Sequence, residues 1–226
     1  MAETNKKSMV PTSLITVFGS HGLVGGSITR RLRAQGYENL SLPTSAEVDL
    51  TSQEAVNAYF QKTKPEFVFM VAGLVGGIQG NMKRPADFLY RNAIMILNVL
   101  EAAKNFSPET KILYTGSTCI YPKENPQPIN ENRFMAGPLE ESNKGYAVAK
   151  GLGVVAGQLY RHQYGLNVVA VMPTNMYGPG DNYDLQNGHF LPALIKRFVD
   201  AKQNDTPLVF WGTGKPRREA LFVDDC

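Results

Sequence analysis

The sequence predicts an α/β fold in which a doubly wound parallel sheet is covered by helices on both faces. From Leu14 onward, short apolar runs alternate with longer segments of helical period, which is typical of repeated βαβ units. A glycine-rich turn follows the first apolar run, at the point where such sheets bind ligands. The chain has 226 residues, of which 43% are hydrophobic and 19% charged, so it is long enough to bury this core.

The apolar runs predict five strands, and the periodic segments between them predict four helices. We expect strands at residues 14–19, 40–43, 66–72, 111–117 and 167–173. We expect helices at residues 23–35, 52–63, 86–105 and 143–164. The helix at 52–63 has the best-defined start, because Thr51 or Ser52 can cap its first turn.

The composition changes after Pro173. A stretch rich in Gly, Pro, Asn and Asp predicts a loop over residues 174–189, and "FLPALIKRFVDAK" then predicts an amphipathic helix. "PLVFWG" and "ALFV" read as strands, but these elements are too few to close a second core. We therefore expect a flexible tail at 1–13, a first domain at 14–174 and an incomplete, truncated second domain at 175–226.

Charge and cysteine content narrow the class of protein. The net charge is +3 and the basic residues are scattered, except at 215–219, which favours an anionic small molecule over nucleic acid as the partner. Neither a membrane-length apolar span nor a signal pattern is present, which predicts a cytoplasmic protein. The two cysteines, Cys119 and Cys226, cannot build a disulfide framework, so Cys119 is expected to be a free thiol.

The turn after the first strand has the spacing of a dinucleotide site. Gly19, Gly22 and Gly25 form GxxGxxG between a strand and a helix, where glycine permits a tight turn and lets backbone N–H groups approach a pyrophosphate. This strand, turn and helix order predicts a Rossmann-type NAD(P)-binding domain over residues 14–174.

The residue that would distinguish NAD from NADP is not decisive. An acid at the end of the second strand favours NAD and an arginine favours NADP, but this chain has Pro43, followed by Thr and Ser. His21 is the nearest basic side chain within the turn. Asp49 and Leu50 lie farther along and face the adenine, or Asp49 instead caps the next helix. The pattern alone leaves the choice of cofactor open.

Two polar motifs point to acid–base chemistry on a carbonyl or hydroxyl oxygen. Tyr146 and Lys150 are four residues apart in a helical segment and share one face, so the ammonium can stabilise a phenolate. Ser117 ends the fourth strand, where its hydroxyl either binds the same substrate oxygen or caps the following turn. If the chain is still extended there, Cys119 shares the face of Ser117; the plainer interpretation of Cys119 is a small buried side chain.

Further motifs carry a resemblance to a known family. The chain resembles the extended short-chain dehydrogenase/reductases and, among them, the GDP-L-fucose synthase family of NAD-dependent epimerase/dehydratase enzymes. The resemblance runs from about Ile15 to the last residue and rests on "GLVGGIQGN" (73–81), "GSTCIYP" (116–122), "YAVAK" (146–150), "VMPTNMYGPGDNYDLQNGHFLPALIKRF" (171–198) and "VFWGTGKPRRE" (209–219).

This resemblance implies an NADP-dependent oxidoreductase with epimerase activity. The implied reaction converts GDP-4-keto-6-deoxy-D-mannose to GDP-L-fucose, by C3/C5 epimerisation and then C4 reduction. Tyr146 with Lys150 would serve the C4 oxygen, and Cys119 with His189 would exchange the protons at C3 and C5. A thiol and an imidazole both exchange protons near neutral pH. NADP(H) is the implied cofactor, with NAD(H) still allowed by Pro43, and a homodimer is the implied assembly.

The resemblance also implies the binding residues, and no metal site. The catalytic residues would be Ser117, Cys119, Tyr146, Lys150 and His189. The cofactor would be bound by Gly19, His21, Gly22, Leu23, Gly25, Asp49, Leu50, Ala72, Tyr146, Lys150, Pro173, Asn175 and His189. The nucleotide sugar would be bound by Val75, Gly76, Gly77, Ser117, Cys119, Asn175, His189, Trp211 and Arg218.

Two other functions fit the same motifs. A nucleotide-sugar 4-epimerase that keeps NAD bound would use Ser117, Tyr146 and Lys150 but would not need Cys119 and His189. A non-catalytic dinucleotide-binding protein is favoured only by the abrupt end of the chain. For single residues, Trp211 also reads as a core aromatic, Arg218 as a surface charge and His189 as a first-turn helix residue.

Overall fold

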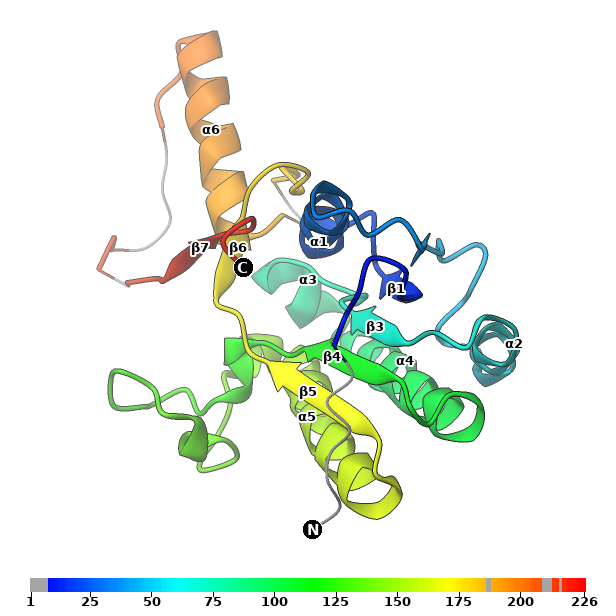
Figure 1. Ribbon diagram of the computed structural model, residues 1–226. Helices are drawn as coiled ribbons and strands as arrows, with labels where there is room; N and C mark the ends of the chain where they lie inside the picture. The colour runs from blue at the N-terminus through cyan, green and yellow to red at the C-terminus, as the bar shows by residue number, and fades with distance from the viewer. Residues whose placement is uncertain (1–7, 186–187, 209–212, 216) are drawn as a thin grey trace.

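A five-stranded parallel sheet forms the centre of the structure (Figure 1). The computed structural model describes residues 8–185, 188–208, 213–215 and 217–226. The strands are β1 (Ile15–Phe18), β2 (Leu40–Ser41), β3 (Phe67–Met70), β4 (Lys111–Thr115) and β5 (Asn167–Val171). Their order is β2-β1-β3-β4-β5 and every pair is parallel, which confirms the doubly wound class. Each strand is shorter than predicted.

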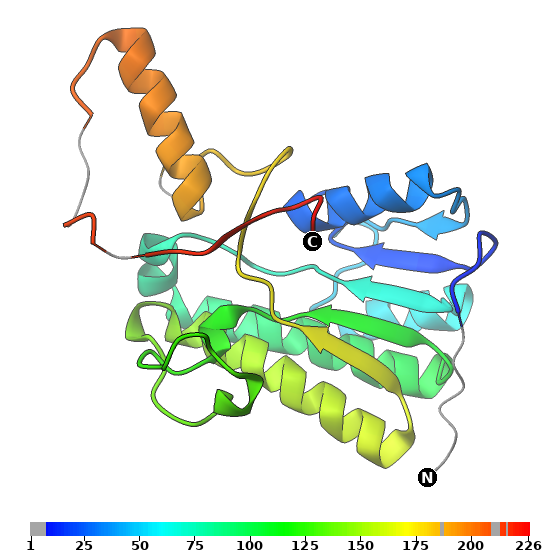
Figure 2. The same ribbon diagram turned by 60° about the vertical axis from the view of Figure 1, so that its left-hand side comes forward.

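Helices cover the two faces of this sheet unequally (Figure 2). The helix α1 (Leu23–Ala34) lies on one face, and α2 (Gln53–Thr63), α4 (Pro85–Phe106) and α5 (Lys144–Tyr164) pack together on the other. The strand order reverses direction between β1 and β3, so the crevice outside their carboxyl ends is the expected ligand position.

The main core lies between the sheet and the three packed helices. It includes Phe60 of α2, Leu100 of α4 and Tyr114 of β4, all essentially without solvent exposure. Every residue of β1 is buried because both faces of that strand are covered. The predicted cap of α2 is confirmed, since the Ser52 side chain accepts a hydrogen bond of 3.3 Å from the Ala55 N–H.

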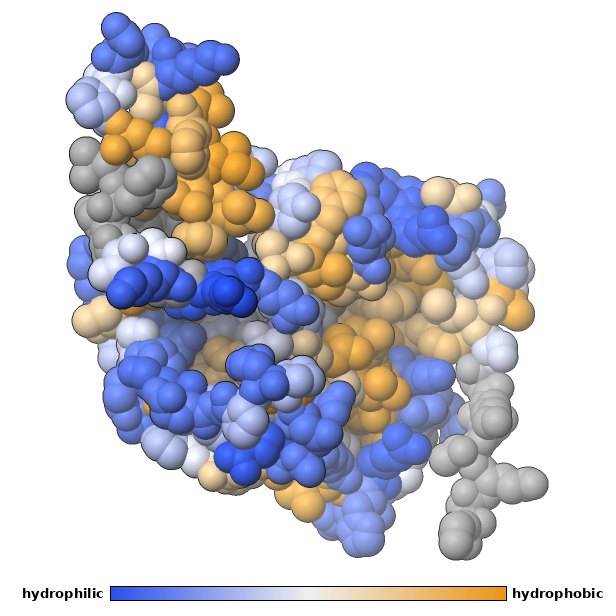
Figure 3. Space-filling model, turned by 90° about the vertical axis from the view of Figure 1, so that its left-hand side faces the viewer, coloured by the Kyte–Doolittle hydropathy of each residue, from blue (hydrophilic) through white to orange (hydrophobic). Residues whose placement is uncertain are grey.

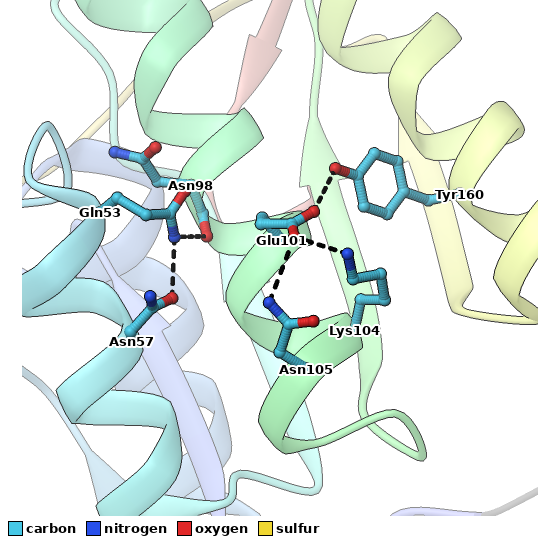
Figure 4. A network of polar contacts seen from close by, with 7 residues as sticks. All are labelled: Gln53, Asn57, Asn98, Glu101, Lys104, Asn105 and Tyr160. Carbon is cyan, nitrogen blue, oxygen red and sulfur yellow. Dashed lines mark hydrogen bonds and ion pairs between the residues drawn. The ribbon is translucent and has the colours of Figure 1, made fainter.

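Polar contacts between the helices are formed at their partly exposed edges (Figure 4). Gln53 Nε2 donates to Asn57 Oδ1 at 2.9 Å and to the Asn98 carbonyl at 3.1 Å, which joins α2 to α4. The Tyr160 hydroxyl of α5 donates to Glu101 Oε2 of α4 at 2.8 Å. These contacts fix the helices against one another at a site away from the carboxyl ends of the strands.

Among the α-helices and strands of the described residues, two were not predicted. The short helix α3 (Ile78–Lys83) follows Gly77, and β6 (Asn175–Tyr177) lies within the segment expected to be loop. A three-residue strand has no recognisable period, and β6 exists because it pairs in parallel with β7 (Ala220–Phe222), more than forty residues later in the chain. This pair forms a second, separate sheet.

The helix α6 (Phe190–Asn204) projects from the body of the molecule (Figures 1 and 2). Apolar side chains gather along it in the space-filling view (Figure 3), and they include Phe190, Ile195 and Val199, which are largely exposed. The amphipathic helix was predicted; the strand expected at 207–212 falls mostly outside the described residues. None of the helices that the structure describes combines the length and the apolar character needed to cross a membrane.

Candidate active site

The glycine turn between β1 and α1 has the geometry that a bound pyrophosphate requires. Gly19 has a φ of +88°, and a Cβ there would lie 2.8 Å from the Ala72 backbone at the end of β3. A Cβ on Gly25 would lie 2.1 Å from the Gly19 carbonyl oxygen. Gly22 is the N-cap of α1, and the first turn of this twelve-residue helix presents backbone N–H groups that intrahelical bonds do not use. The residues present therefore fit a dinucleotide.

A basic side chain and a carboxylate lie near the glycine turn, on the side of β2. The exposed His21 has its Nδ1 atom 3.1 Å from Ser20 Oγ. Glu47 accepts hydrogen bonds from the Thr44 N–H at 2.8 Å and from Thr44 Oγ1 at 2.9 Å. These bonds, and to a smaller extent the charge of His21, lower the pKa of Glu47. A carboxylate therefore lies near the basic side chain of the turn.

Asp49 does not cap α2, whose N-cap is Ser52, but it stabilises the turn that leads into this helix. Its Oδ1 atom accepts from the N–H and the hydroxyl of Thr51, at 2.9 and 2.7 Å, in the turn before α2. Leu50 is buried in the main core, and Leu23 is half-buried in the first turn of α1. Asp49 and Leu50 thus have structural roles whether or not a dinucleotide contacts them.

Lys150 is the most deeply buried charged group of the site, with 4% of its surface exposed. Its Nζ atom donates to the Thr115 carbonyl at 2.7 Å and lies 5.7 Å from the centre of the Tyr146 ring and 5.2 Å from that of Tyr114. Burial lowers the pKa of Lys150 to about 8, and the neighbouring Cys119 opposes this shift. The predicted pairing of Tyr146 and Lys150 on one helix face is present.

The pKa of Tyr146 is shifted in the direction opposite to the prediction. The spacing predicted that Lys150 would lower it, but burial raises it, with smaller contributions from Cys119 and Tyr114. The ammonium lies over the Tyr146 ring and is hydrogen-bonded to Thr115, while the ring packs edge-on against Phe88 with 6.4 Å between centroids. The phenol therefore keeps its proton at neutral pH, which is the state that a proton donor requires.

Ser117 and Cys119 lie together, but not for the predicted reason. The strand β4 ends at Thr115, and Thr118–Ile120 forms a single 3₁₀ turn instead of an extended segment. Ser117 caps this turn, because its Oγ atom accepts a hydrogen bond of 3.4 Å from the Cys119 N–H. Burial raises the pKa of the Cys119 thiol, whereas the Ser117 side chain and the charge of Lys150 lower it. Four of the five predicted catalytic residues are thus neighbours.

The fifth, His189, comes from a different part of the chain. It is exposed at the N-cap position of α6. Burial raises the pKa of Asp181 in the preceding loop, while the Asn182 N–H and the charge of His189 lower it. Among the residues that the structure describes, no hydrogen bond or ion pair joins His189 to Cys119 or Tyr146. The sequence did not predict that the Asp181 carboxylate lies close enough to His189 for their charges to interact.

The predicted sugar-binding residues next to the sheet lie around the start of α3. Val75 is more than half exposed, and Gly77 is the N-cap of α3. A Cβ on Gly76 would lie 3.1 Å from the Phe88 ring, so this glycine permits close packing. The buried Asn92 of α4 holds this loop, accepting from the Leu74 N–H at 2.9 Å and donating to the Leu74 carbonyl at 3.0 Å.

The remaining predicted residues belong to the second sheet and its connections. Pro173 is half-buried after β5, and Asn175 of β6 donates from Nδ2 to the Glu219 carbonyl at 3.0 Å. Arg218 is exposed and donates to the carbonyl of Arg217. Trp211 lies outside the described residues.

Sequence reasoning missed Tyr114, Thr115 and Asn92 as members of the site. Tyr114 reads as an ordinary core residue of an apolar strand, and the Thr115 contribution comes from its backbone, so neither gives a signal. Asn92 does give one, since it is a polar residue in an otherwise apolar stretch of helix. Within the described parts of the chain, no group of three His, Cys, Asp or Glu side chains is placed to hold a metal ion.

Known proteins share this fold and sequence. Probable GDP-L-fucose synthase 1 of Oryza sativa subsp. japonica is 48% identical over 212 residues, which are 93% of this chain and 65% of that protein. GDP-L-fucose synthase of Escherichia coli (strain K12) is 41% identical over 93% of this chain and 66% of its own length. The chain thus spans slightly less than two thirds of the length of these relatives.

Solved structures lead to the same family. The crystal structure of a GDP-L-fucose synthetase from Naegleria fowleri bound to NADP has a TM-score of 0.86 and 31% identity, covering 97% of this chain and 72% of that one. The family model described as NAD dependent epimerase/dehydratase matches residues 15–226. With its glycine turn and its Tyr146 and Lys150 pair in place, the chain belongs to the NAD dependent epimerase/dehydratase family.

Proposed function

We propose that the protein converts GDP-4-keto-6-deoxy-D-mannose to GDP-L-fucose, by epimerisation at C3 and C5 followed by NADPH-dependent reduction at C4. The observation that carries this proposal is the position of Cys119, whose thiol lies beside Ser117 and the Lys150 ammonium in the cluster that also contains Tyr146. A reductase or a 4-epimerase needs the other three residues but not the thiol. The names of the rice and E. coli relatives support the substrate.

In the reduction, NADPH bound at the glycine turn would supply the hydride. Tyr146 would donate its proton to the C4 oxygen, because burial keeps the phenol protonated until substrate arrives. The buried Lys150 cation would favour the phenolate that remains, and the Ser117 hydroxyl would hydrogen-bond the same oxygen. The same groups would stabilise the enolate oxygen during epimerisation.

Epimerisation requires a base and an acid on opposite faces of the sugar. Cys119 would act from the β4 side, where the charge of Lys150 favours its thiolate. His189 would act from the N-terminus of α6, near the Asp181 carboxylate. Arg218 and Trp211 would belong to a nucleotide-sugar-binding part formed from residue 175 onward.

NADP(H) is the proposed cofactor. The NADP-bound Naegleria fowleri structure supports this choice. His21 would be the basic group nearest the 2′-phosphate, because Pro43 occupies the position where an arginine is usual. NAD(H) is the alternative cofactor. The Glu47 carboxylate near His21 favours NAD(H), because an acidic side chain near the end of the second strand is typical of NAD binding.

We further propose a cytoplasmic homodimer. Exposed apolar side chains are present on both α4 and α5, and they include Leu89, Leu152 and Leu159. A helix pair of this kind suits a self-complementary interface. A free Cys119 suits a reducing compartment. Analytical ultracentrifugation should show a dimer, and Leu159→Glu should give a monomer.

The function is tested with the purified protein, GDP-4-keto-6-deoxymannose and either NADPH or NADH in deuterated water at about pH 7. We expect oxidation of NADPH and deuterium at C3 and C5 of the product. Tyr146→Phe should retain cofactor binding and lose most of the oxidation. Oxidation without deuterium would show a plain C4 reductase, and no oxidation of either NADPH or NADH would contradict the proposed reaction.

A further inference from the structure

The ammonium of Lys150 is enclosed by groups from three elements. Tyr146 belongs to α5 itself, Tyr114 and the Thr115 carbonyl belong to β4, and Cys119 belongs to the 3₁₀ turn after β4. The loop after β3 also approaches, since a Cβ on Gly73 would lie 3.6 Å from Nζ. One hydrogen bond, to Thr115, holds the ammonium directly. Two aromatic rings, those of Tyr114 and Tyr146, also face the ammonium.

Tyr114 is the nearer of the two aromatic rings. Nζ lies over its face at 5.2 Å from the centroid, against 5.7 Å for Tyr146. The Tyr114 side chain is 2% exposed, so this contact is made away from water, where attraction between a cation and a ring face is strongest. Its hydroxyl donates to the Lys150 carbonyl at 3.4 Å, a long hydrogen bond that contributes little to the packing of the ring against α5.

The helix has a gap that admits this ring. Gly153 lies three residues after Lys150, and a Cβ there would lie 2.5 Å from the Tyr114 hydroxyl oxygen and Cζ. Glycine in a helix interior is unfavourable by about 1 kcal/mol relative to alanine. The contact with Tyr114 explains why position 153 is a glycine, because a larger side chain there would displace the Tyr114 ring from its position next to Lys150.

We propose that Tyr114 is a positioning residue that holds the Lys150 ammonium through the face of its ring, in a gap provided by Gly153. The proposal deepens the function proposed above, because Lys150 serves the reaction only if its charge is retained beside Tyr146. Tyr114 does not itself contact the reacting atoms in this arrangement. Its hydroxyl is dispensable for this role and its π face is not.

The test measures the titration of Lys150 directly, in the 226-residue chain without substrate. Lysine is labelled with ¹³C at Cε, the Lys150 signal is assigned with Lys150→Met, and its shift is followed by NMR from about pH 6 to 11. Tyr114→Phe keeps the ring and removes the hydroxyl. Tyr114→pentafluorophenylalanine keeps the shape and reverses the charge distribution of the ring face, so it separates packing from electrostatics.

We expect the midpoint of the Lys150 titration in the unmodified chain to lie near pH 8, because burial lowers the pKa of this lysine. Tyr114→Phe should leave it unchanged, and the fluorinated ring should lower it by roughly one pH unit. An unchanged midpoint with the fluorinated ring would overturn the proposal, as would an equal shift in both variants. Because the measurement needs no turnover, it succeeds or fails independently of the substrate proposed above.

A second readout uses the rate of the proposed C4 reduction. If Tyr114 positions Lys150, the fluorinated ring should lower kcat for C4 reduction roughly twofold at pH 7 and nearly tenfold at about pH 9, with little change in KM, and Tyr114→Phe should keep kcat. A purely structural role for Tyr114 would give similar kcat values and pH profiles in both variants.

Discussion

Cys119 is the residue whose protonation state decides the proposed epimerisation. Only the thiolate can remove a proton from carbon, and burial raises the pKa of this thiol, so the reactive form is a minority at neutral pH. The Ser117 side chain and the Lys150 charge act in the opposite direction. The rate of proton exchange should therefore increase as pH rises toward the titration of Lys150 at about 8, and flatten once that cation is lost.

Cys119→Ser should abolish deuterium incorporation at C3 and C5 while leaving NADPH binding unchanged, because a hydroxyl is far harder to ionise than a thiol. Mass spectrometry of the sugar and fluorescence of bound NADPH measure the two effects. Cys226→Ser is the matched control, since that cysteine is exposed and should be replaceable without effect. Exchange at the unmodified rate in Cys119→Ser would exclude the thiol as the base.

Lys150 lowers the stability of the fold at neutral pH. Its pKa in the folded chain is about 8, below the ordinary 10.5, so between these values the unfolded chain binds a proton that the folded chain does not. The free energy of unfolding therefore rises with pH through this window, and below about 8 the full cost of the buried charge is present. A buried ammonium is retained here at the expense of stability.

Lys150→Met should consequently raise the free energy of unfolding at pH 7 by roughly 2 kcal/mol, the cost of the buried charge less the hydrogen bond to Thr115. The gain should shrink steadily from about pH 8 to 10.5. Urea unfolding at several pH values measures it, and the exposed Lys62→Met on α2 should show no such gain. A gain that is independent of pH would mean that packing, not charge, is responsible.

At the scale of elements, the strands and helices around the main core could be predicted, because apolar runs and helical periods carry their own signal. The helix 143–164 was expected and α5 spans Lys144–Tyr164. The turn that carries Cys119 could not be predicted in detail, since nothing in "TGSTCIYP" distinguishes an extended segment from one 3₁₀ turn. The contact between Tyr114 and Lys150 could not be predicted either, because it depends on how β4 and α5 pack across one another.

The crossing of β4 and α5 depends on the glycine at 153. Gly153→Ala should lower the free energy of unfolding by about 1–3 kcal/mol, because the overpacked Cβ meets the Tyr114 ring at 2.5 Å and outweighs the gain in helix propensity. The matched control is Gly26→Ala in α1, where the nearest atoms lie 3.6 Å away, and it should be neutral or stabilising. Thermal unfolding measures the stability of both variants. An equal change in stability for Gly153→Ala and Gly26→Ala would show that the Tyr114 contact imposes no steric limit at position 153.

At the scale of the whole molecule, the second sheet is fastened to the helix that carries the glycine turn. After β7, Asp224 accepts from the Ser27 hydroxyl of α1 at 2.6 Å and pairs with Arg30 at 2.9 Å. The buried Val223 donates from its N–H to the Tyr177 carbonyl at 2.9 Å, which continues the pairing of β7 with β6. The contacts of Asp224 with Ser27 and Arg30 thus connect the glycine turn to the proposed sugar-binding part.

The hydrogen bond between Ser27 and Asp224 should contribute more to this connection than the ion pair between Arg30 and Asp224. The Ser27 side chain is buried, whereas Arg30 and Asp224 are each about half exposed. Asp224→Ala should therefore speed hydrogen exchange of the Val223 amide roughly tenfold, while amides of β1 and β3 keep their protection. Asp224→Asn retains an acceptor for Ser27 but not the charge, so its exchange rate should lie between the two. If Asp224→Ala leaves the exchange of residues 220–226 unchanged, β7 is held by its pairing with β6 alone, and the two sheets are not coupled through α1.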